Sequence, residues 1–141
     1  MLQLARETSS RRKPFPKGMS PILDSLKGQG LIKKPVTEVP ELIRMLREGG
    51  MVERSSACVG ISELAKKEPE KALETVPALI EAFNRWGAMT KAVIAETFVE
   101  LQDWRALPSL IKNADAKQWE LRARVQWALS NIPAVILKPL E

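Results

Sequence analysis

Two glutamates are the residues best spaced for chemistry in this chain. Glu96 and Glu100 lie four positions apart in a predicted helix, which places both carboxylates on one face, as general acid-base catalysis or metal binding requires. The chain contains no His, the commonest metal ligand and general base, and no second carboxylate pair stands at matching positions. A solvent-exposed helix face explains the pair better than a site does. We therefore predict no catalytic residue and no metal.

The single cysteine and the glycine-containing turns lead to the same expectation. Cys58 cannot form an intramolecular disulfide, and without a His the chain has no imidazole to activate its thiolate. It aligns with Ala95 of a later repeat, so we predict an inert core residue. The glycines at 28, 30, 49 and 50 lack the Lys and Ser/Thr of a phosphate-binding loop and read as turns. The sequence thus indicates a protein without enzymatic activity or cofactor.

The elements that would position these residues repeat along the chain. Three prolines are each followed, after one residue, by Leu-Ile, and each has a basic residue 14 positions further on. Proline suits the first turn of a helix, where its missing N–H costs no hydrogen bond, and the aliphatic residues after it begin an apolar stripe. The prolines are Pro40, Pro77 and Pro108, and the basic residues are Arg54, Lys91 and Arg122.

These repeats predict an all-α protein with helix pairs at about 40–64, 77–101 and 108–132. The second helix of each pair should begin near Met51, Ala88 and Trp119, after a turn. The residues expected to be buried share the in-register apolar positions. They are Leu42, Ile43, Ile61, Leu64, Leu79, Ile80, Phe98, Leu101, Leu110, Ile111 and Leu129.

The pattern P-x-L-I…R-x-x-A…L-x-x-L resembles HEAT repeats, and the segment LQDWRALPSLI from Leu101 to Ile111 is similar to the joint between the short HEAT-like repeats of phycobilisome lyases. The resemblance covers about residues 39–132 and implies an α-solenoid of about three helix pairs. The family often has an Asp in the turn before the basic residue. In the three repeats of this chain that position holds Glu48, Arg85 and Ala116. We therefore do not predict the series of contacts between successive turns that the Asp residues form in the family.

Atypical segments flank the repeats. Pro21 opens a degenerate first helix, and Pro133 begins a fourth unit that ends at Glu141. Because a solenoid exposes apolar faces at both ends, we interpret these segments as caps. The alternative is that one end stays open and pairs with a second copy, forming a homo-oligomer. The predicted organisation is a basic extended arm at 1–19, a capping helix and linker at 20–38, and the repeat domain with its C-terminal cap at 39–141.

The resemblance also implies a binding surface, because the second helices of HEAT-like arrays form the concave wall. Trp127 is the large aromatic residue on that wall and the type of side chain that anchors partners. The alternative is that Trp127 packs beneath the C-terminal cap. Trp86, Trp104 and Trp119 are expected to pack turns. The predicted partner-binding residues are Glu96, Glu100, Arg124, Trp127 and Asn131.

The net positive charge of the chain is concentrated in its N-terminal segment. Residues 1–35 hold eight basic and two acidic residues, a net charge of +6, whereas the remaining 106 residues carry −1. Prolines at 14 and 16 keep the arm extended, so its cations could follow successive phosphates and Phe15 could stack on a base. A solubilising tail and a contact with an acidic protein are the alternatives. The predicted nucleic-acid contacts are Arg6, Arg11, Arg12, Lys13, Phe15 and Lys17.

Together these features predict a non-enzymatic scaffold or adaptor that binds a protein partner through its concave face. The alternative is an RNA- or DNA-associated protein, such as a ribonucleoprotein component, docking through the arm. No stretch approaches 18 uninterrupted apolar residues, and the first twelve residues lack the apolar core of a secretory signal. We therefore expect no membrane partner and a cytoplasmic location.

Overall fold

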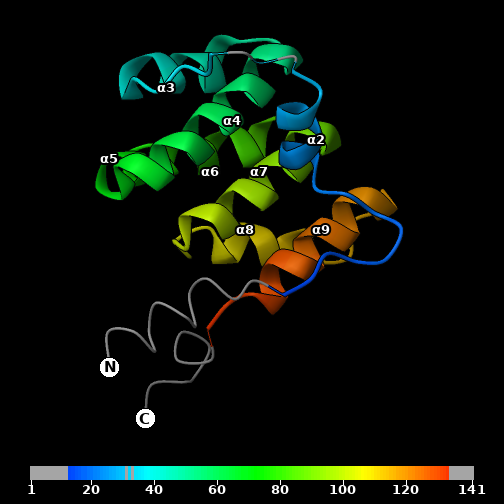
Figure 1. Ribbon diagram of the computed structural model, residues 1–141. Helices are drawn as coiled ribbons and strands as arrows, with labels where there is room; N and C mark the ends of the chain where they lie inside the picture. The colour runs from blue at the N-terminus through cyan, green and yellow to red at the C-terminus, as the bar shows by residue number, and fades with distance from the viewer. Residues whose placement is uncertain (1–12, 31, 33, 134–141) are drawn as a thin grey trace, which may run out of the picture.

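The computed structural model describes residues 13–30, 32 and 34–133, and over this range the protein is all-helical, without a strand (Figure 1). The all-α prediction is confirmed. The segment after Pro133, predicted as the C-terminal cap, and residues 1–12 of the arm lie outside the described residues. The helices are α2 (Ile22–Gly28), α3 (Val39–Glu48), α4 (Met51–Lys67), α5 (Pro69–Leu73), α6 (Val76–Arg85), α7 (Ala88–Leu101), α8 (Leu107–Lys112) and α9 (Trp119–Ser130).

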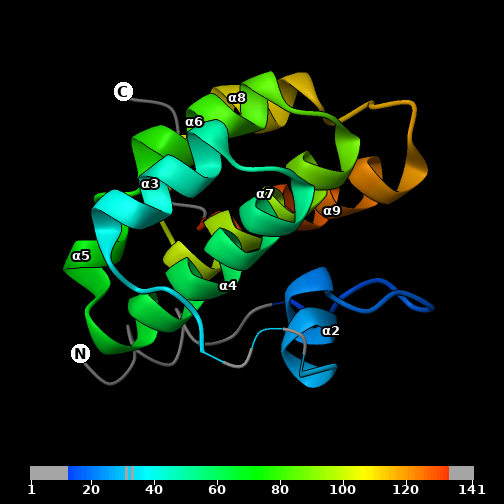
Figure 2. The same cartoon turned by 90° about the horizontal axis from the view of Figure 1, so that it is seen from above.

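The helix pairs pack in two layers. Figure 2 shows α3, α6 and α8 in one row and α4, α7 and α9 in the next. Within the rows α3 contacts α6 and α6 contacts α8, while α4 contacts α7 and α7 contacts α9. The predicted starts of both helices in every pair are confirmed, with a proline in the first turn of each first helix. The longer linker between the first two pairs contains α5, which packs on α4 and α7.

The basic residue shared by the three repeats stabilises the turn between the two helices of its own pair. Arg54 donates to the carbonyl of Gly49 at 2.7 Å, and Lys91 donates to the carbonyls of Phe83 and Trp86 at 2.6 and 2.9 Å. Arg122 donates to the carbonyl of Ala116 at 2.7 Å. Carbonyls at and just after the end of a helix have no partner within the helix, so a cation supplies one in each repeat.

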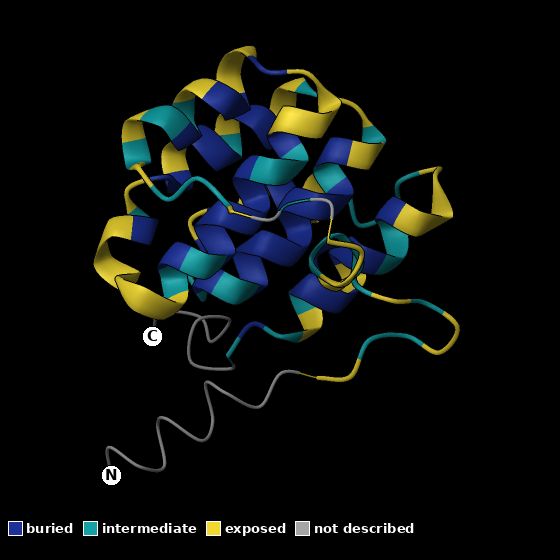
Figure 3. Ribbon diagram, turned by 45° about the horizontal axis from the view of Figure 1, so that its top comes forward, coloured by how far each residue is buried: buried dark blue, intermediate teal, exposed yellow. Residues whose placement is uncertain are grey.

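Helix α7 is the centre of the fold. Residues 92–99 are buried without interruption, because α4, α6, α9 and α2 all pack around this helix (Figure 3). The rings of Phe83 and Phe98 meet there with their centroids 5.9 Å apart. Most of the predicted core is confirmed as buried. Ile43, Ile80 and Leu129 are only partly buried, and the prediction is wrong for Ile111, which is 58% exposed because the short helix α8 turns this residue away from the second layer.

Helix α2 lies across α4 and α7, as a cap would, with Leu23 buried beneath it. The linker from α2 to α3 then passes directly over α4. A side-chain carbon at Gly60 would collide with the backbone carbonyl of Val36, so the close approach of this linker requires glycine in α4. None of the described helices is both long enough and apolar enough to cross a membrane.

We predict that Phe98→Ala lowers the free energy of unfolding by about 3 to 5 kcal/mol, through lost transfer energy and a residual cavity at the centre of the core. Phe98 is fully buried against Phe83. Urea denaturation followed by circular dichroism measures the loss. The matched control is Ile111→Ala, which should cost less than about 0.5 kcal/mol because this side chain is exposed. A comparable loss for the two variants would contradict the assigned core.

Candidate partner-binding groove

The surface between α7 and α9 carries the predicted partner-binding residues, and we call it the α7–α9 groove. Its α7 wall follows one helical stripe, and so does its α9 wall, since the members of each stripe lie three or four positions apart. The α7 stripe is Met89, Ala92, Glu96 and Glu100, and the α9 stripe is Glu120, Arg124, Trp127 and Asn131. The helical array therefore brings the predicted residues onto two facing walls.

The C-terminal half of this groove holds the chain's own arm. The backbone N–H of Lys13 donates to Oδ1 of Asn131 at 2.9 Å, and the indole Nε1 of Trp127 donates to the carbonyl of Lys13 at 2.9 Å. The ring of Phe15 lies on Trp127 with a centroid separation of 4.6 Å. One anchor side chain and a pair of hydrogen bonds to the backbone of Lys13 thus hold this segment. The arm is not extended throughout as predicted, because the N–H of Met19 donates to the carbonyl of Pro16 at 3.2 Å and closes a turn there. In the structure, Trp127 packs against the arm. The sequence had suggested two other neighbours for it, a partner protein or the C-terminal cap, and that cap lies outside the described residues.

A buried ion pair closes the groove at its middle. Nε of Arg124 donates to the carboxylate of Glu96 at 2.9 Å. The same carboxylate accepts the backbone N–H groups of Ile22 at 2.8 Å and Leu23 at 2.9 Å, at the start of α2. Nη2 of Arg124 also donates to the carbonyl of Ser20 at 3.3 Å. The pair therefore connects α7, α9 and the segment that leads into α2.

The expectation of a solvent-exposed face is wrong for Glu96, which is 2% exposed. Burial raises the pKa of Glu96, while the donors Leu23, Ile22 and Arg124 oppose that rise. Within the described part of the chain, no buried side-chain N or O atom lacks a hydrogen-bond partner. The carboxylate is therefore engaged by three donors and shielded from water, and it connects the segments that supply those donors.

Glu100, one turn further along α7, lies at the edge of the occupied half. It is partly buried and lines a cavity of about 220 Å³ together with Phe15, Asp24 and Trp127. Glu96 and Glu100, which lie on one face of the helix as their spacing predicted, therefore have different surroundings. In residues 13–30, 32 and 34–133, no group of three or more His, Cys, Asp or Glu side chains could hold a metal ion.

The other tryptophans divide into packed and exposed. Trp86 donates through Nε1 to the carbonyl of Leu46 at 3.0 Å and has the guanidinium of Arg54 at 3.9 Å from its ring centroid. Trp104 is buried and lies in the connection between α7 and α8. The prediction is wrong for Trp119, which is 57% exposed because no described element covers the first turn of α9.

The predicted nucleic-acid residues fall into three groups. Arg6, Arg11 and Arg12 lie outside the described residues. Lys13 and Lys17 are exposed on the arm. Phe15 is partly buried, with Trp127 as the aromatic partner of its ring and the guanidinium of Arg124 at 5.6 Å from its centroid. A base contact by any of these residues stays a prediction.

Comparison of the chain with protein-family models, with curated proteins and with solved structures finds no match. The resemblance to HEAT repeats therefore stays a prediction from the residues of the sequence, and the groove is interpreted from its own geometry.

We predict strong energetic coupling between Glu96 and Arg124. Either Glu96→Leu or Arg124→Met alone should lower the free energy of unfolding by about 3 to 5 kcal/mol, because each leaves a buried charge unpaired. The double variant should lose much less than the sum, and urea denaturation of all four proteins measures the difference.

The matched control for this cycle is the exposed pair of Arg47 and Glu81, which are 3.2 Å apart. Screening by solvent should hold its coupling below about 1 kcal/mol. Equal coupling energies in the two cycles would show that the buried pair does not organise the groove.

We predict that the Cys58 thiol is unreactive in the folded protein. Burial raises its pKa to about 12 and the residue is 1% exposed, so at pH 8 the thiol is protonated and shielded. Ellman's reagent should label one thiol per chain in guanidinium chloride and essentially none in native buffer. Rapid labelling of the native protein would show that α4 opens readily or that the thiol is accessible.

Proposed function

We propose that this protein is a non-enzymatic interaction scaffold, a short HEAT-like α-solenoid with a basic N-terminal arm that binds an extended segment of a protein partner through its concave second-helix wall. The shape of the described part supports this proposal. Its second helices form a continuous layer, and the groove between two of them holds a non-helical segment of the chain. Arrays of this architecture create extended binding surfaces in the same way.

The observation that carries the proposal is the manner in which the groove holds the arm. The contacts of Asn131, Trp127 and Arg124 go to backbone groups of Lys13 and Ser20, and one aromatic side chain fills the space over Trp127. Backbone hydrogen bonds place a peptide without selecting its sequence, while a single pocket side chain supplies selectivity. A groove built this way can bind another extended segment of similar chemistry.

Association with RNA or DNA is the second candidate, and the exposure of Lys13 and Lys17 favours it. Phosphate contacts would make affinity fall steeply with salt concentration, whereas the groove contacts described above are hydrogen bonds and packing. The salt dependence of partner binding therefore separates the two candidates.

We predict that the groove binds the arm sequence when it is supplied as a separate peptide. An acetylated, fluorescein-labelled peptide spanning residues 13–24 should bind the full-length Phe15→Ser variant at least about tenfold more tightly than the unmodified chain, whose own arm competes at an effective concentration in the millimolar range. Fluorescence anisotropy gives both dissociation constants.

Adding Trp127→Ala to the Phe15→Ser variant should weaken peptide binding by about 2 kcal/mol, a factor of roughly 30. The control peptide carries Ser in place of its Phe and should bind weakly to every variant. Absence of binding to the Phe15→Ser chain, with its circular dichroism unchanged, would mean that the groove is only an intramolecular packing surface.

A further inference from the structure

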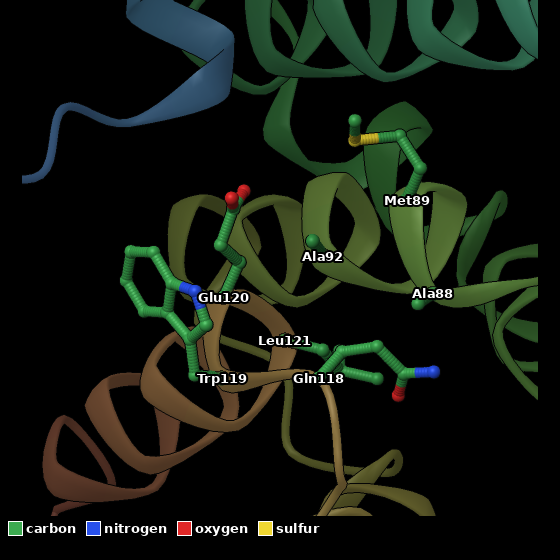
Figure 4. A pocket seen from close by; sticks show the side chains of 7 residues that line it. All are labelled: Ala88, Met89, Ala92, Gln118, Trp119, Glu120 and Leu121. Atoms are coloured by element: carbon green, nitrogen blue, oxygen red, sulfur yellow. The ribbon is translucent and has the colours of Figure 1, made fainter.

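The N-terminal half of the α7–α9 groove is open. Between the first turns of the two helices lies a cavity of about 410 Å³ whose lining is mostly apolar. Figure 4 shows Ala92 on the floor between Met89 on one side and Trp119 on the other, with the carboxylate of Glu120 extending beside the indole. Met89 and Trp119 are 51% and 57% exposed. We call this the open half, lined by Ala88, Met89, Ala92, Gln118, Trp119, Glu120 and Leu121.

The exposed apolar side chains follow the repeat. Met51 begins α4 and Trp119 begins α9, while Val52 and Met89 are the second residues of α4 and α7. Four of the five exposed large hydrophobic residues in the described part of the chain thus occupy the first two positions of second helices. Scattered apolar residues on a surface need no explanation, but a row at equivalent positions of consecutive repeats is typical of an interaction surface.

The open half continues an interface that the molecule already uses. On α7 the stripe runs from Met89 through Ala92 to Glu96, and on α9 from Glu120 through Arg124 to Trp127, with the buried ion pair between the two halves. Beyond that pair, the arm shows what this groove accepts. It is a non-helical segment that packs a large apolar side chain, Phe15, on Trp127 and has a basic residue, Lys13, two positions away.

The charge of the open half indicates which kind of residue a bound segment would place next to its apolar side chain. Glu120 is the single ionisable residue in its lining and is exposed. Within residues 13–30, 32 and 34–133, the ion-pair partner of its carboxylate is Arg124 at 4.0 Å, and that guanidinium is already bonded to Glu96 at 2.9 Å. A cation from a partner can therefore approach the Glu120 carboxylate without breaking the buried pair.

We propose that the open half docks an extended segment of a partner protein that places a large apolar side chain among Met89, Ala92 and Trp119 and a Lys or Arg beside Glu120. This inference rests on the proposed scaffold function. It assigns the open half of the α7–α9 groove to the partner, while the arm remains in the other half.

The test selects random peptides of about twelve residues, displayed on phage, against the immobilised full chain. Enriched sequences should carry a large aliphatic or aromatic residue with Lys or Arg within a few positions. Synthetic copies should bind at least about tenfold more weakly to Trp119→Ser, because the anchor contact is lost. They should also bind several-fold more weakly to Glu120→Lys, and Ile111→Ser, an equally exposed site on α8, should leave the affinity unchanged.

Three outcomes would overturn the proposal: no enrichment, an acidic consensus, or peptides that bind Trp119→Ser as well as the unmodified chain. Self-association of the full chain that Trp119→Ser abolishes, without peptide enrichment, would instead identify a second copy as the occupant. Because Trp119 and Glu120 are exposed, their replacement should leave the thermal melt unchanged. Binding of the arm peptide to the occupied half is measured separately, so failure of the open half is distinguishable from failure of the scaffold function.

Discussion

The fold depends on how it accommodates one buried carboxylate. Glu96 lies near the middle of α7, where eight consecutive residues are buried, and an unpaired charge there would cost several kcal/mol. The charge is balanced by Arg124 from α9 and by two N–H groups at the start of α2. Satisfying one side chain thus requires α9 to pack beside α7 and requires the N-terminal segment to fold back over both. Replacing the pair by apolar residues could preserve the packing of α7 on α9, but it would remove the carboxylate that accepts the N–H groups at the start of α2.

The same pair divides the α7–α9 groove into an occupied half and an open half. The C-terminal half is filled by a segment of the same chain, and covalent linkage gives that segment a high effective concentration, so a free competitor starts at a disadvantage. The N-terminal half lacks such a segment among the described residues and leaves Met89 and Trp119 in contact with solvent. Exposed apolar surface contributes little to the stability of the chain, and its placement in the continuation of an occupied groove is what favours the proposed role in recognition.

The repeats could be predicted from the sequence because their signals are local. A proline in the first turn, a stripe of aliphatic residues and a basic residue 14 positions later each depend on a few neighbouring residues, and the structure has both helices of every pair where these signals place them. The burial of Glu96 could not be predicted in this way, since its backbone partners lie 73 and 74 positions away in the chain. The predictions that Ile111 and Trp119 are packed were wrong for a related reason. A periodic pattern gives the face of a helix but does not say whether another element covers that face.

Arg124 is a charged residue that contacts both halves of the groove. Arg124 bonds firmly to Glu96 on the occupied side and lies only within 4.0 Å of Glu120 on the open side. Because Glu120 is exposed, its interaction with Arg124 is worth no more than about 1 kcal/mol, and a partner's cation that displaced it would leave the buried pair and the arm almost undisturbed. Occupation of one half should therefore change the affinity of the other by less than about fivefold. Such weak coupling would suit the proposed scaffold, because a partner could then bind and leave the open half while the arm stays in place in the occupied half.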